Sequence, residues 1–378
     1  MTTAGDGVRH LYVHLPFCAH RCGYCDFVTL VGRAADHGSY VDALLAELEL
    51  QRPVLAPRLE TIFLGGGTPT FTSASELARL LAALPGAEEV TVEANPETVT
   101  PGLALLLREH GVTRVSVGAQ SFRSHLLAVL ERRATPAAVR AAVYALRDVD
   151  FDNISLDLLY GIPGQSAADL DRDLSDALAL EPEHLSCYEL EAKQGTRFTH
   201  TYGNELARQG EAMEDYFERV VDRLTGAGYR WYETANFCVR PEHARGRDLR
   251  ARHNLAYWRG RDYLGIGVGA VSTVRGRRWR TTPRLGRYLA ALGRGQVPPR
   301  ELEPLPSSVQ RRERVLLGLR LDEPLVLRGL AEAVDSAALA RLEELGLAER
   351  RRGEAGETVA LTTRGRFLGG GVTAELLA

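Results

Sequence analysis

The chain has 378 residues, of which 45% are hydrophobic and 25% are charged, and its formal net charge is -3. This mixture is typical of a globular protein of two or three domains and excludes collagen-like, disordered and disulfide-scaffold classes. No apolar stretch approaches the roughly 20 residues of a membrane helix, so we expect no membrane span. The N-terminal stretch includes Asp6 and Arg9 and contains no apolar signal segment, which indicates a cytoplasmic protein with reduced thiols.

Short apolar runs alternate with helical patterns along the first half of the chain. Strands are expected at residues 11–17, 61–64, 89–93, 114–117, 153–159 and 185–190. Helices are expected between them, at residues 40–50, 75–84, 101–110, 136–147 and 168–180. Such strict alternation predicts an α/β fold with a parallel sheet and helical crossovers, either an open doubly wound sheet or a full or partial (β/α) barrel.

A different pattern follows these elements. A helix is expected to begin near Glu211 and to end at Gly226, and residues 229–238 form a further strand candidate. The section 240–300 contains fifteen arginines against three acidic residues, which gives it a local charge of +12. Two interpretations remain open for this section: a solvated basic face, or a surface for an anionic ligand such as nucleic acid, carboxylates or a protein partner.

The last part of the chain is predicted to be a separate small domain. Four prolines mark a linker before it: Pro298, Pro299, Pro304 and Pro306. Helical patterns at 311–319 and 330–345, followed by a short strand at 358–362, predict a helical, winged-helix-like fold. We therefore expect three parts, which are a core at 1–238, a basic segment at 239–300 and a C-terminal domain at 301–378.

Cysteine spacing is the strongest chemical signal in the sequence. Three of the five cysteines lie within eight residues: Cys18, Cys22 and Cys25. Three thiolates on a loop directly after a strand can bind three irons of a cubane iron–sulfur cluster and leave the fourth iron open. Zinc is the alternative, with His14 or His20 as the fourth ligand. Cys187 and Cys238 are interpreted as buried core residues.

This C-x3-C-x2-C loop, with Tyr24 before the last cysteine, resembles the cluster loop of the radical S-adenosylmethionine (SAM) superfamily. The resemblance implies a partial (β/α)6 barrel and a [4Fe-4S] cluster whose open iron is chelated by the amino and carboxylate groups of SAM. The run LGGGTPT at 64–70 follows the second expected strand and is similar to the superfamily loop that binds the SAM amino group. This similarity implies SAM contacts at Gly66, Gly67 and Thr68.

Polar residues stand on three later strands, at or near the carboxyl ends where parallel barrels place their sites: Glu93, Gln120 and Asp157. By resemblance to the superfamily, these residues and Arg132 would contact the amino acid and ribose portions of SAM. Tyr12 and Tyr24 would flank the cluster and the adenine. No catalytic residue is assigned beyond these cofactor contacts.

Within the superfamily, the chain is similar to the oxygen-independent coproporphyrinogen III oxidase family, which has a dehydrogenase branch and a haem-chaperone branch. Dehydrogenases carry a further cysteine two residues after the third cluster ligand, where this chain has Phe27, and a longer N-terminal segment. The run HNLAYW at 253–258 resembles the HNxxYW signature of the haem chaperones. These two features favour the chaperone branch.

The HNxxYW resemblance implies that His253 ligates haem iron and that Asn254, Tyr257 and Trp258 contact the haem. Histidine nitrogen is a common axial ligand of haem iron. Tyr257 lies four residues after His253, on the same face of a helix, and Tyr257 or Trp258 can pack on the porphyrin. Neighbouring arginines can pair with the propionates. Val271 stands where the chaperone pattern has histidine, so a second axial ligand is not assigned.

We therefore expect a cytoplasmic haem chaperone that binds a [4Fe-4S] cluster, SAM and haem. Its expected partners are an electron donor for the cluster and a haem-accepting protein, such as a respiratory haem protein. One alternative is an oxygen-independent coproporphyrinogen III dehydrogenase, and the other is a radical enzyme that modifies RNA or protein. The basic segment lacks a recognisable nucleic-acid module, so we expect no nucleic-acid partner.

Overall fold

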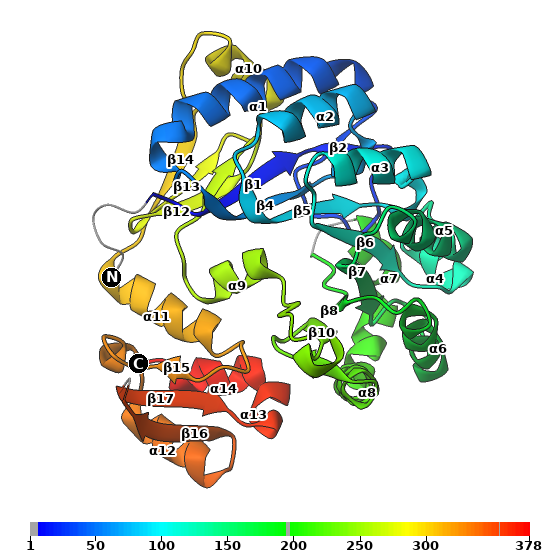
Figure 1. Ribbon diagram of the computed structural model, residues 1–378. Coiled ribbons are helices and arrows are strands. Elements are labelled where there is room, and N and C mark those ends of the chain that lie inside the picture. The colour runs from blue at the N-terminus through cyan, green and yellow to red at the C-terminus, as the bar shows by residue number, and fades with distance from the viewer. Residues whose placement is uncertain (1–6, 194–196, 355) are drawn as a thin grey trace.

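The computed structural model describes residues 7–193, 197–354 and 356–378, so part of the N-terminal stretch considered above lies outside the described residues. A nine-stranded sheet with the order β11-β1-β4-β5-β6-β7-β8-β10-β9 forms the centre of the protein (Figure 1). Six successive parallel strands form its middle: β1 (His10–Leu15), β4 (Leu59–Gly66), β5 (Ala87–Ala94), β6 (Arg114–Gln120), β7 (Ile154–Tyr160) and β8 (His184–Glu189). These six strands correspond to the six predicted ones, and the expected partial (β/α)6 barrel is confirmed.

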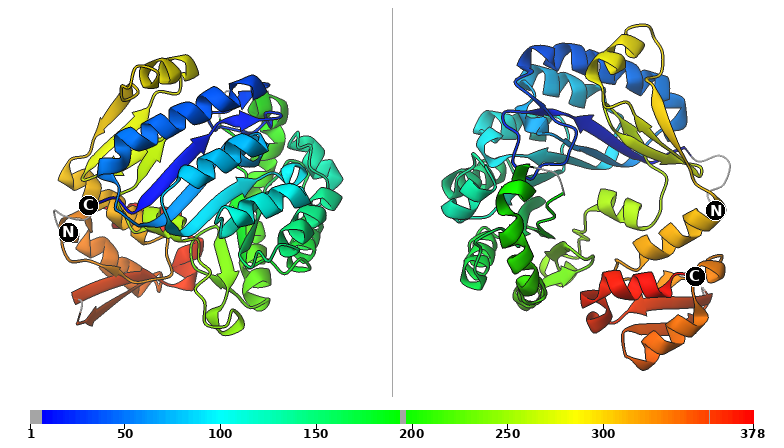
Figure 2. Two further views of the ribbon diagram at one scale, coloured as in Figure 1. Left: turned by 45° about the horizontal axis from the view of Figure 1, so that its top comes forward. Right: turned by 180° about the vertical axis from the view of Figure 1, so that it is seen from behind.

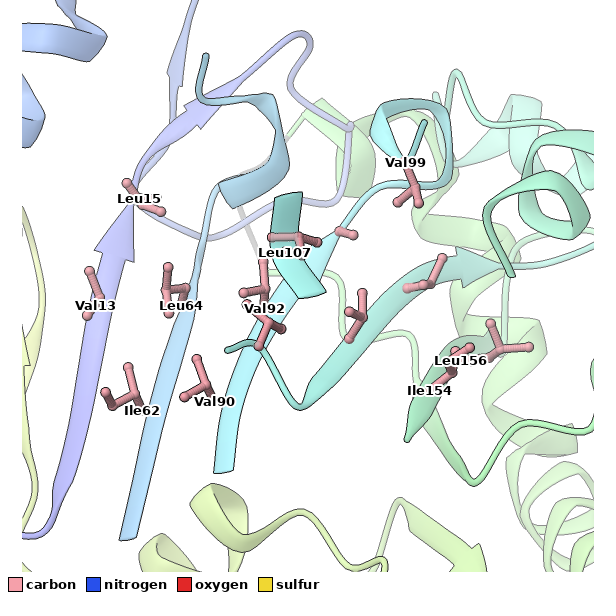
Figure 3. Packing of buried hydrophobic residues seen from close by; sticks show 14 of the residues in the cluster. Val13, Leu15, Ile62, Leu64, Val90, Val92, Val99, Leu107, Ile154 and Leu156 are labelled. Atoms are coloured by element: carbon pink, nitrogen blue, oxygen red, sulfur yellow. The ribbon is translucent and has the colours of Figure 1, made fainter. Parts of the chain in front are cut away.

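Helices cover the outer face of this sheet (Figure 1). They are α1 (His37–Gln51), α2 (Ala74–Ala83), α3 (Pro101–Glu109), α4 (Ser124–Val129), α5 (Pro136–Arg147), α6 (Ala167–Leu178) and α8 (Met213–Gly226). Apolar side chains at paired positions of neighbouring strands form a row beneath them: Val13, Leu64, Val92, Val115 and Ile154. Figure 3 shows this packing, which leaves the alternate, more polar side chains to face the barrel interior.

The two edges of the sheet differ from the prediction. The prediction of a single strand at 229–238 is wrong. The chain turns back there and forms two antiparallel strands, β9 (Tyr229–Trp231) and β10 (Asn236–Val239). Glu233 stabilises the turn, since its Oε2 accepts hydrogen bonds from the Ala235 N–H and the Asn236 side chain. At the other edge, β11 (Leu264–Ile266) pairs in parallel with β1. The basic section therefore contributes a strand to the central sheet.

The rest of the basic section forms α9 (Arg252–Trp258), β12 (Val271–Val274), β13 (Arg277–Thr281) and α10 (Leu285–Leu292). The predicted proline linker contains β14 (Arg300–Pro304), which pairs with β13 in a three-stranded antiparallel sheet. Several arginines pair with carboxylates elsewhere in the chain: Arg247 with Asp152, Arg250 and Arg259 with Glu323, Arg252 with Glu88, and Arg278 with Glu313. Part of the positive charge is thus paired with carboxylates of the same chain, which neither interpretation of the section anticipated.

The C-terminal residues form a smaller body (Figure 2). It contains α11 (Ser307–Gly318), β15 (Leu325–Val326), α12 (Ser336–Glu344), β16 (Ala348–Gly353), β17 (Gly356–Leu361), α13 (Thr363–Phe367) and α14 (Gly369–Leu376). The helix predicted at 330–345 begins later, because the Asp335 side chain accepts from the N–H groups of Ala337 and Ala338 and caps α12.

The C-terminal body has its own apolar core, which includes Val315, Leu339 and Val359. In contrast, Leu264 and Tyr288 of the basic section share the core of the barrel. The boundaries at 238 and 300 stay predictions. No helix in the described part of the chain is both long and apolar enough to cross a membrane.

Glu47 on α1 fastens the basic section to the barrel. Its side chain is fully buried, and its Oε2 accepts hydrogen bonds from the Gly267 N–H and the Tyr288 hydroxyl, both at 2.8 Å. Burial raises the pKa of Glu47 from 4.5 to about 7. Because the folded state holds this proton more tightly than the unfolded chain does, the free energy of unfolding should fall as the pH rises through this interval, by on the order of 3 kcal/mol.

In Glu47→Gln this contribution to the pH dependence should disappear, because glutamine does not titrate but can accept both hydrogen bonds. Denaturant unfolding between about pH 4.5 and about pH 8 measures the change. Glu49→Gln is the matched control, since Glu49 lies exposed on the same helix, and it should retain the wild-type decrease. The prediction is wrong if Glu47→Gln and the wild type lose the same free energy over this range.

Candidate functional site

The three clustered cysteines lie on the loop that follows β1, at the carboxyl end of the barrel. Cys18 ends β2 (Phe17–Cys18), which pairs with β3 (Leu30–Val31) and closes the base of the loop. The Cys25 N–H donates to the Cys22 carbonyl and forms a turn between these two residues. Cys18 is buried, whereas Cys22 and Cys25 are half-buried. The short sheet therefore supports the loop that carries the three thiols.

The surroundings of the thiols fit an iron–sulfur cluster. The Cys18 Sγ lies 3.5 Å from the Thr68 Oγ1, and Arg132 donates to the Cys22 Sγ at 3.7 Å. Burial raises the pKa of Cys18 and of Cys25, so a bound metal would have to displace their protons. Within residues 7–193, 197–354 and 356–378, no three His, Cys, Asp or Glu side chains converge on a single metal position. The thiolates of a cubane bind different irons and need no such convergence.

In the zinc alternative, His14 or His20 would be the fourth metal ligand. The His14 Nε2 donates to the Val28 carbonyl at 2.9 Å, and its Nδ1 therefore accepts from the Tyr12 hydroxyl at 3.0 Å. Both ring nitrogens are engaged away from the thiols. His14 is thus not placed as a fourth metal ligand, and His20 is left as the candidate for that alternative.

The glycine-rich run lies against the cysteine loop. Gly66 has a φ of +109°, and a Cβ there would lie 2.4 Å from the His14 ring, while a Cβ on Gly67 would lie 2.5 Å from the Pro16 carbonyl carbon. Both positions therefore need glycine. The Gly66 N–H donates to the Glu93 Oε2 at 3.0 Å, which joins the end of β4 to the end of β5.

Arg132 connects three parts of the site. Besides its contact with Cys22, it donates to the Gly118 carbonyl at 2.7 Å and to the Asn95 Oδ1 at 2.9 Å. Asn95 in turn donates to the Thr68 Oγ1 at 3.1 Å. Asn95 is a site residue that the motifs did not indicate, although it follows β5 directly, as site residues of parallel barrels do.

Two half-buried carboxyl groups, those of Glu93 and Asp157, face the barrel interior near this network. Asp157 accepts hydrogen bonds from Ser116 at 3.0 Å and from Ser155 at 3.4 Å. Burial, together with the charge of Asp157, raises the pKa of Glu93 to about 7, and burial also raises the pKa of Asp157. A bound cation would favour the charged form of both groups. The pair therefore suits a ligand with a positively charged group, such as the amino group of SAM.

Gln120 and Tyr24 complete the predicted SAM set. Gln120 ends β6 with a φ of +63°, next to an irregularity in the pairing of β6 with β7, so the chain bends at this position. Tyr24 packs edge to face on Phe198, with 6.4 Å between the ring centroids. Phe198 belongs to α7 (Arg197–Gln209), a helix that the sequence pattern did not predict. The individual SAM contacts of these residues stay predictions.

The HNLAYW run forms α9, which lies on the inner side of the sheet (Figure 1). The backbone N–H groups of Arg252 and His253 donate to the Glu89 carboxylate near the start of β5, at 3.2 and 3.1 Å. The His253 ring is only 1% exposed. Its Nδ1 lies 2.7 Å from the Thr61 Oγ1 and its Nε2 lies 2.9 Å from the Tyr257 hydroxyl. Burial lowers the pKa of His253 to about 3, so the ring is neutral.

A cavity of about 240 Å³ opens beside α9. Its walls include Tyr12, His14, Phe27, Tyr257, Tyr263 and Val271. The cavity thus brings together a residue of the HNxxYW run, the end of the cysteine loop and the position where the chaperone pattern has histidine.

Other residues of the HNxxYW run lie away from this cavity. His253 sits behind Tyr257 and does not line it. The Trp258 ring lies under the Arg320 guanidinium, 4.4 Å from the ring centroid, and its carbonyl accepts from Arg314. Asn254 is half-buried on α9. Of the four predicted haem contacts, the structure brings only Tyr257 to the cavity wall.

Comparisons with known proteins agree with the site. The family model for the radical SAM superfamily matches residues 12–177. A protein of Mycobacterium tuberculosis named heme chaperone HemW is 36% identical over 97% of this chain and 94% of its own length. The protein of the same name from Bacillus subtilis is 31% identical over 98% of this chain and 99% of its own.

The structure of coproporphyrinogen III oxidase (HemN) from Escherichia coli also has this fold. It covers 98% of this chain and 90% of its own, with a TM-score of 0.80 and 22% sequence identity. These matches extend over nearly the whole chain, which includes the cysteine loop, the glycine-rich run and the barrel. The chain belongs to the radical SAM superfamily and, within it, to the family of the HemW proteins.

Proposed function

We propose that this protein is a haem chaperone, which holds haem beside a SAM-ligated [4Fe-4S] cluster and passes it to a haem-accepting protein such as a respiratory haem protein. The observation that carries the proposal is the cavity shared by Tyr257 of the HNxxYW helix and Phe27 after the cysteine loop. The two relatives named heme chaperone HemW support it, since they align with nearly the whole chain.

Cys18, Cys22 and Cys25 would hold the cluster, and the chemistry that it would supply when bound is the donation of an electron to SAM. The chain itself binds and orients the ligand. The glycine-rich loop lets the backbone approach SAM closely, and Glu93 offers negative charge to its amino group. The hydrogen bonds of Arg132 to Cys22 and to the Gly118 carbonyl hold the cysteine loop against the strand ends. A separate electron-donor protein would reduce the cluster.

Only one edge of the haem macrocycle would enter the cavity. The cavity is smaller than the roughly 300 Å³ of pockets that enclose a ligand, so most of a porphyrin would stay outside it. Aromatic rings on the wall can pack on the macrocycle, and Arg280 at the same wall can pair with a propionate. Partial exposure suits a carrier, because an acceptor can contact the haem before it leaves.

Cys22→Ala should lose the broad charge-transfer absorbance of the cluster after anaerobic reconstitution, because only two of the three thiolates would remain. Iron and acid-labile sulfide analysis checks the loss. Cys187→Ala is the matched control, since Cys187 is a buried cysteine of the apolar core, and it should reconstitute like the wild type. Wild-type iron and sulfide in Cys22→Ala would contradict the assignment of the cluster.

Glu93→Gln should bind SAM about 10- to 100-fold more weakly, because a charge-assisted hydrogen bond to the SAM amino group would be lost. Equilibrium dialysis of the reconstituted protein measures the affinity, and the cluster absorbance should stay unchanged. Glu88→Gln is the control, since Glu88 lies on the same strand and pairs with Arg252 at the surface. Equal SAM affinity in both variants would exclude Glu93 from SAM binding.

The proposed function is tested by anaerobic reconstitution, followed by haem titration and by incubation with coproporphyrinogen III and SAM. The wild type should bind haem in a fixed ratio and transfer it to a haem-free acceptor protein, without release of carbon dioxide from coproporphyrinogen. Release of carbon dioxide without haem binding would instead identify the dehydrogenase alternative.

A further inference from the structure

A chain of polar groups runs from the protein surface to the cavity beside α9, and all of its members except the outermost carboxylate are joined by hydrogen bonds. Its members are Glu60, His10, Thr61, His253 and Tyr257. The His10 Nε2 lies 3.7 Å from the Glu60 carboxylate, and the Thr61 Oγ1 lies 2.9 Å from the His10 Nδ1 and 2.7 Å from the His253 Nδ1. Glu60 is 45% exposed, whereas the three residues between it and Tyr257 are buried.

The protons of this chain can be assigned from its outer end. The negative charge of Glu60, 3.7 Å from the His10 Nε2, favours the tautomer with a proton on that nitrogen, and in this tautomer the His10 Nδ1 accepts from the Thr61 hydroxyl. The Thr61 oxygen then accepts from the His253 Nδ1. The remaining His253 Nε2 carries a lone pair and accepts from the Tyr257 hydroxyl. His253 therefore directs its free lone pair at the Tyr257 phenol and not at the cavity.

We propose that the Tyr257 oxygen, and not a nitrogen of His253, is the axial ligand of haem iron, and that His253 positions Tyr257. This inference rests on the proposed function, since it assumes that haem is the cargo. Tyr257 lines the cavity, whereas His253 lies behind it with both nitrogens engaged. Tyrosine oxygen is an axial ligand in other haem proteins.

The buried chain of polar groups can carry away the proton that Tyr257 releases when its oxygen binds iron. The Tyr257 O–H bond breaks and its oxygen binds ferric iron, while the proton moves to the His253 Nε2. His253, Thr61 and His10 each pass one proton outward, so that one proton reaches Glu60 or solvent and no electron is transferred. The Tyr257 ring is also held in place, because it packs edge to face on Tyr263 and on His253, with centroid distances of 4.6 and 4.9 Å.

The other polar groups on the cavity wall lack such a path. The Tyr12 hydroxyl donates to the His14 Nδ1, but the His14 Nε2 donates to the Val28 carbonyl, which does not pass a proton on. The Tyr263 hydroxyl pairs with the Thr273 side chain and has no imidazole partner there. Among the tyrosines of this wall, Tyr257 alone adjoins a proton path that reaches the surface.

Resonance Raman and electron paramagnetic resonance spectra of the full-length, cluster-loaded protein with ferric haem test the proposal. The wild type should show iron–phenolate vibrations and a high-spin ferric signal, and the oxidised cluster contributes no resonance. Protein grown with ring-deuterated tyrosine should shift these vibrations. A wild-type complex with imidazole ligation alone would overturn the inference, whereas a wild type that binds no haem would overturn the proposed function as well.

Tyr257→Phe should lose the iron–phenolate vibrations and bind haem at least about tenfold more weakly. Tyr263→Phe, from the same cavity wall, should retain the vibrations. His253→Ala should also retain them, at a shifted frequency, because its imidazole no longer contacts the ligand oxygen. Loss of iron ligation in His253→Ala together with an unchanged spectrum in Tyr257→Phe would identify His253 as the ligand instead.

Thr61→Val removes the hydroxyl that joins the two histidines. The iron–phenolate signal should then form more slowly after mixing with ferric haem, and its final spectrum should match that of the wild type. Stopped-flow absorbance measures the rate, and a rate equal to that of the wild type would exclude the buried chain as the proton path.

Discussion

Burying polar side chains inside the barrel is costly unless they are hydrogen-bonded, and this constraint shapes the site. A buried polar group left without a hydrogen bond costs about 1–3 kcal/mol. The Glu93 carboxylate meets this requirement at the Gly66 N–H, and the Glu89 carboxylate meets it at the first N–H groups of α9. The same strand, β5, thus fixes the glycine-rich loop at one end of the barrel and the HNxxYW helix nearer the other.

Much of this arrangement could be predicted because the signals are local. Each parallel strand carries an apolar face that shows as a short run in the sequence, and the strand ends place Glu93 and Gln120 without further information. The cysteine spacing indicated the cluster loop for the same reason, since Cys18, Cys22 and Cys25 lie on one short segment. The HNxxYW run likewise indicated that α9 carries function.

What could not be predicted depends on contacts between distant parts of the chain. Thr61 meets His253 across 192 positions, and nothing near either residue indicates that the imidazole is buried against a hydroxyl. The strand β11 is three residues long, too short for a recognisable pattern, and it forms because β1 offers a free edge. Asn95 accepts a hydrogen bond from Arg132, and the position of Arg132 depends on how the segment after α4 folds back toward the strand ends.

The outermost strands of the central sheet, β11 and β9, remain apart, so in the described part of the chain the ring of strands does not close. In a closed barrel, strand number and stagger together fix the diameter. An open ring has no such fixed width, because its curvature can change through small adjustments of twist while every main-chain hydrogen bond is kept. The width of the scaffold can therefore change without disturbing the strands that carry the cysteine loop.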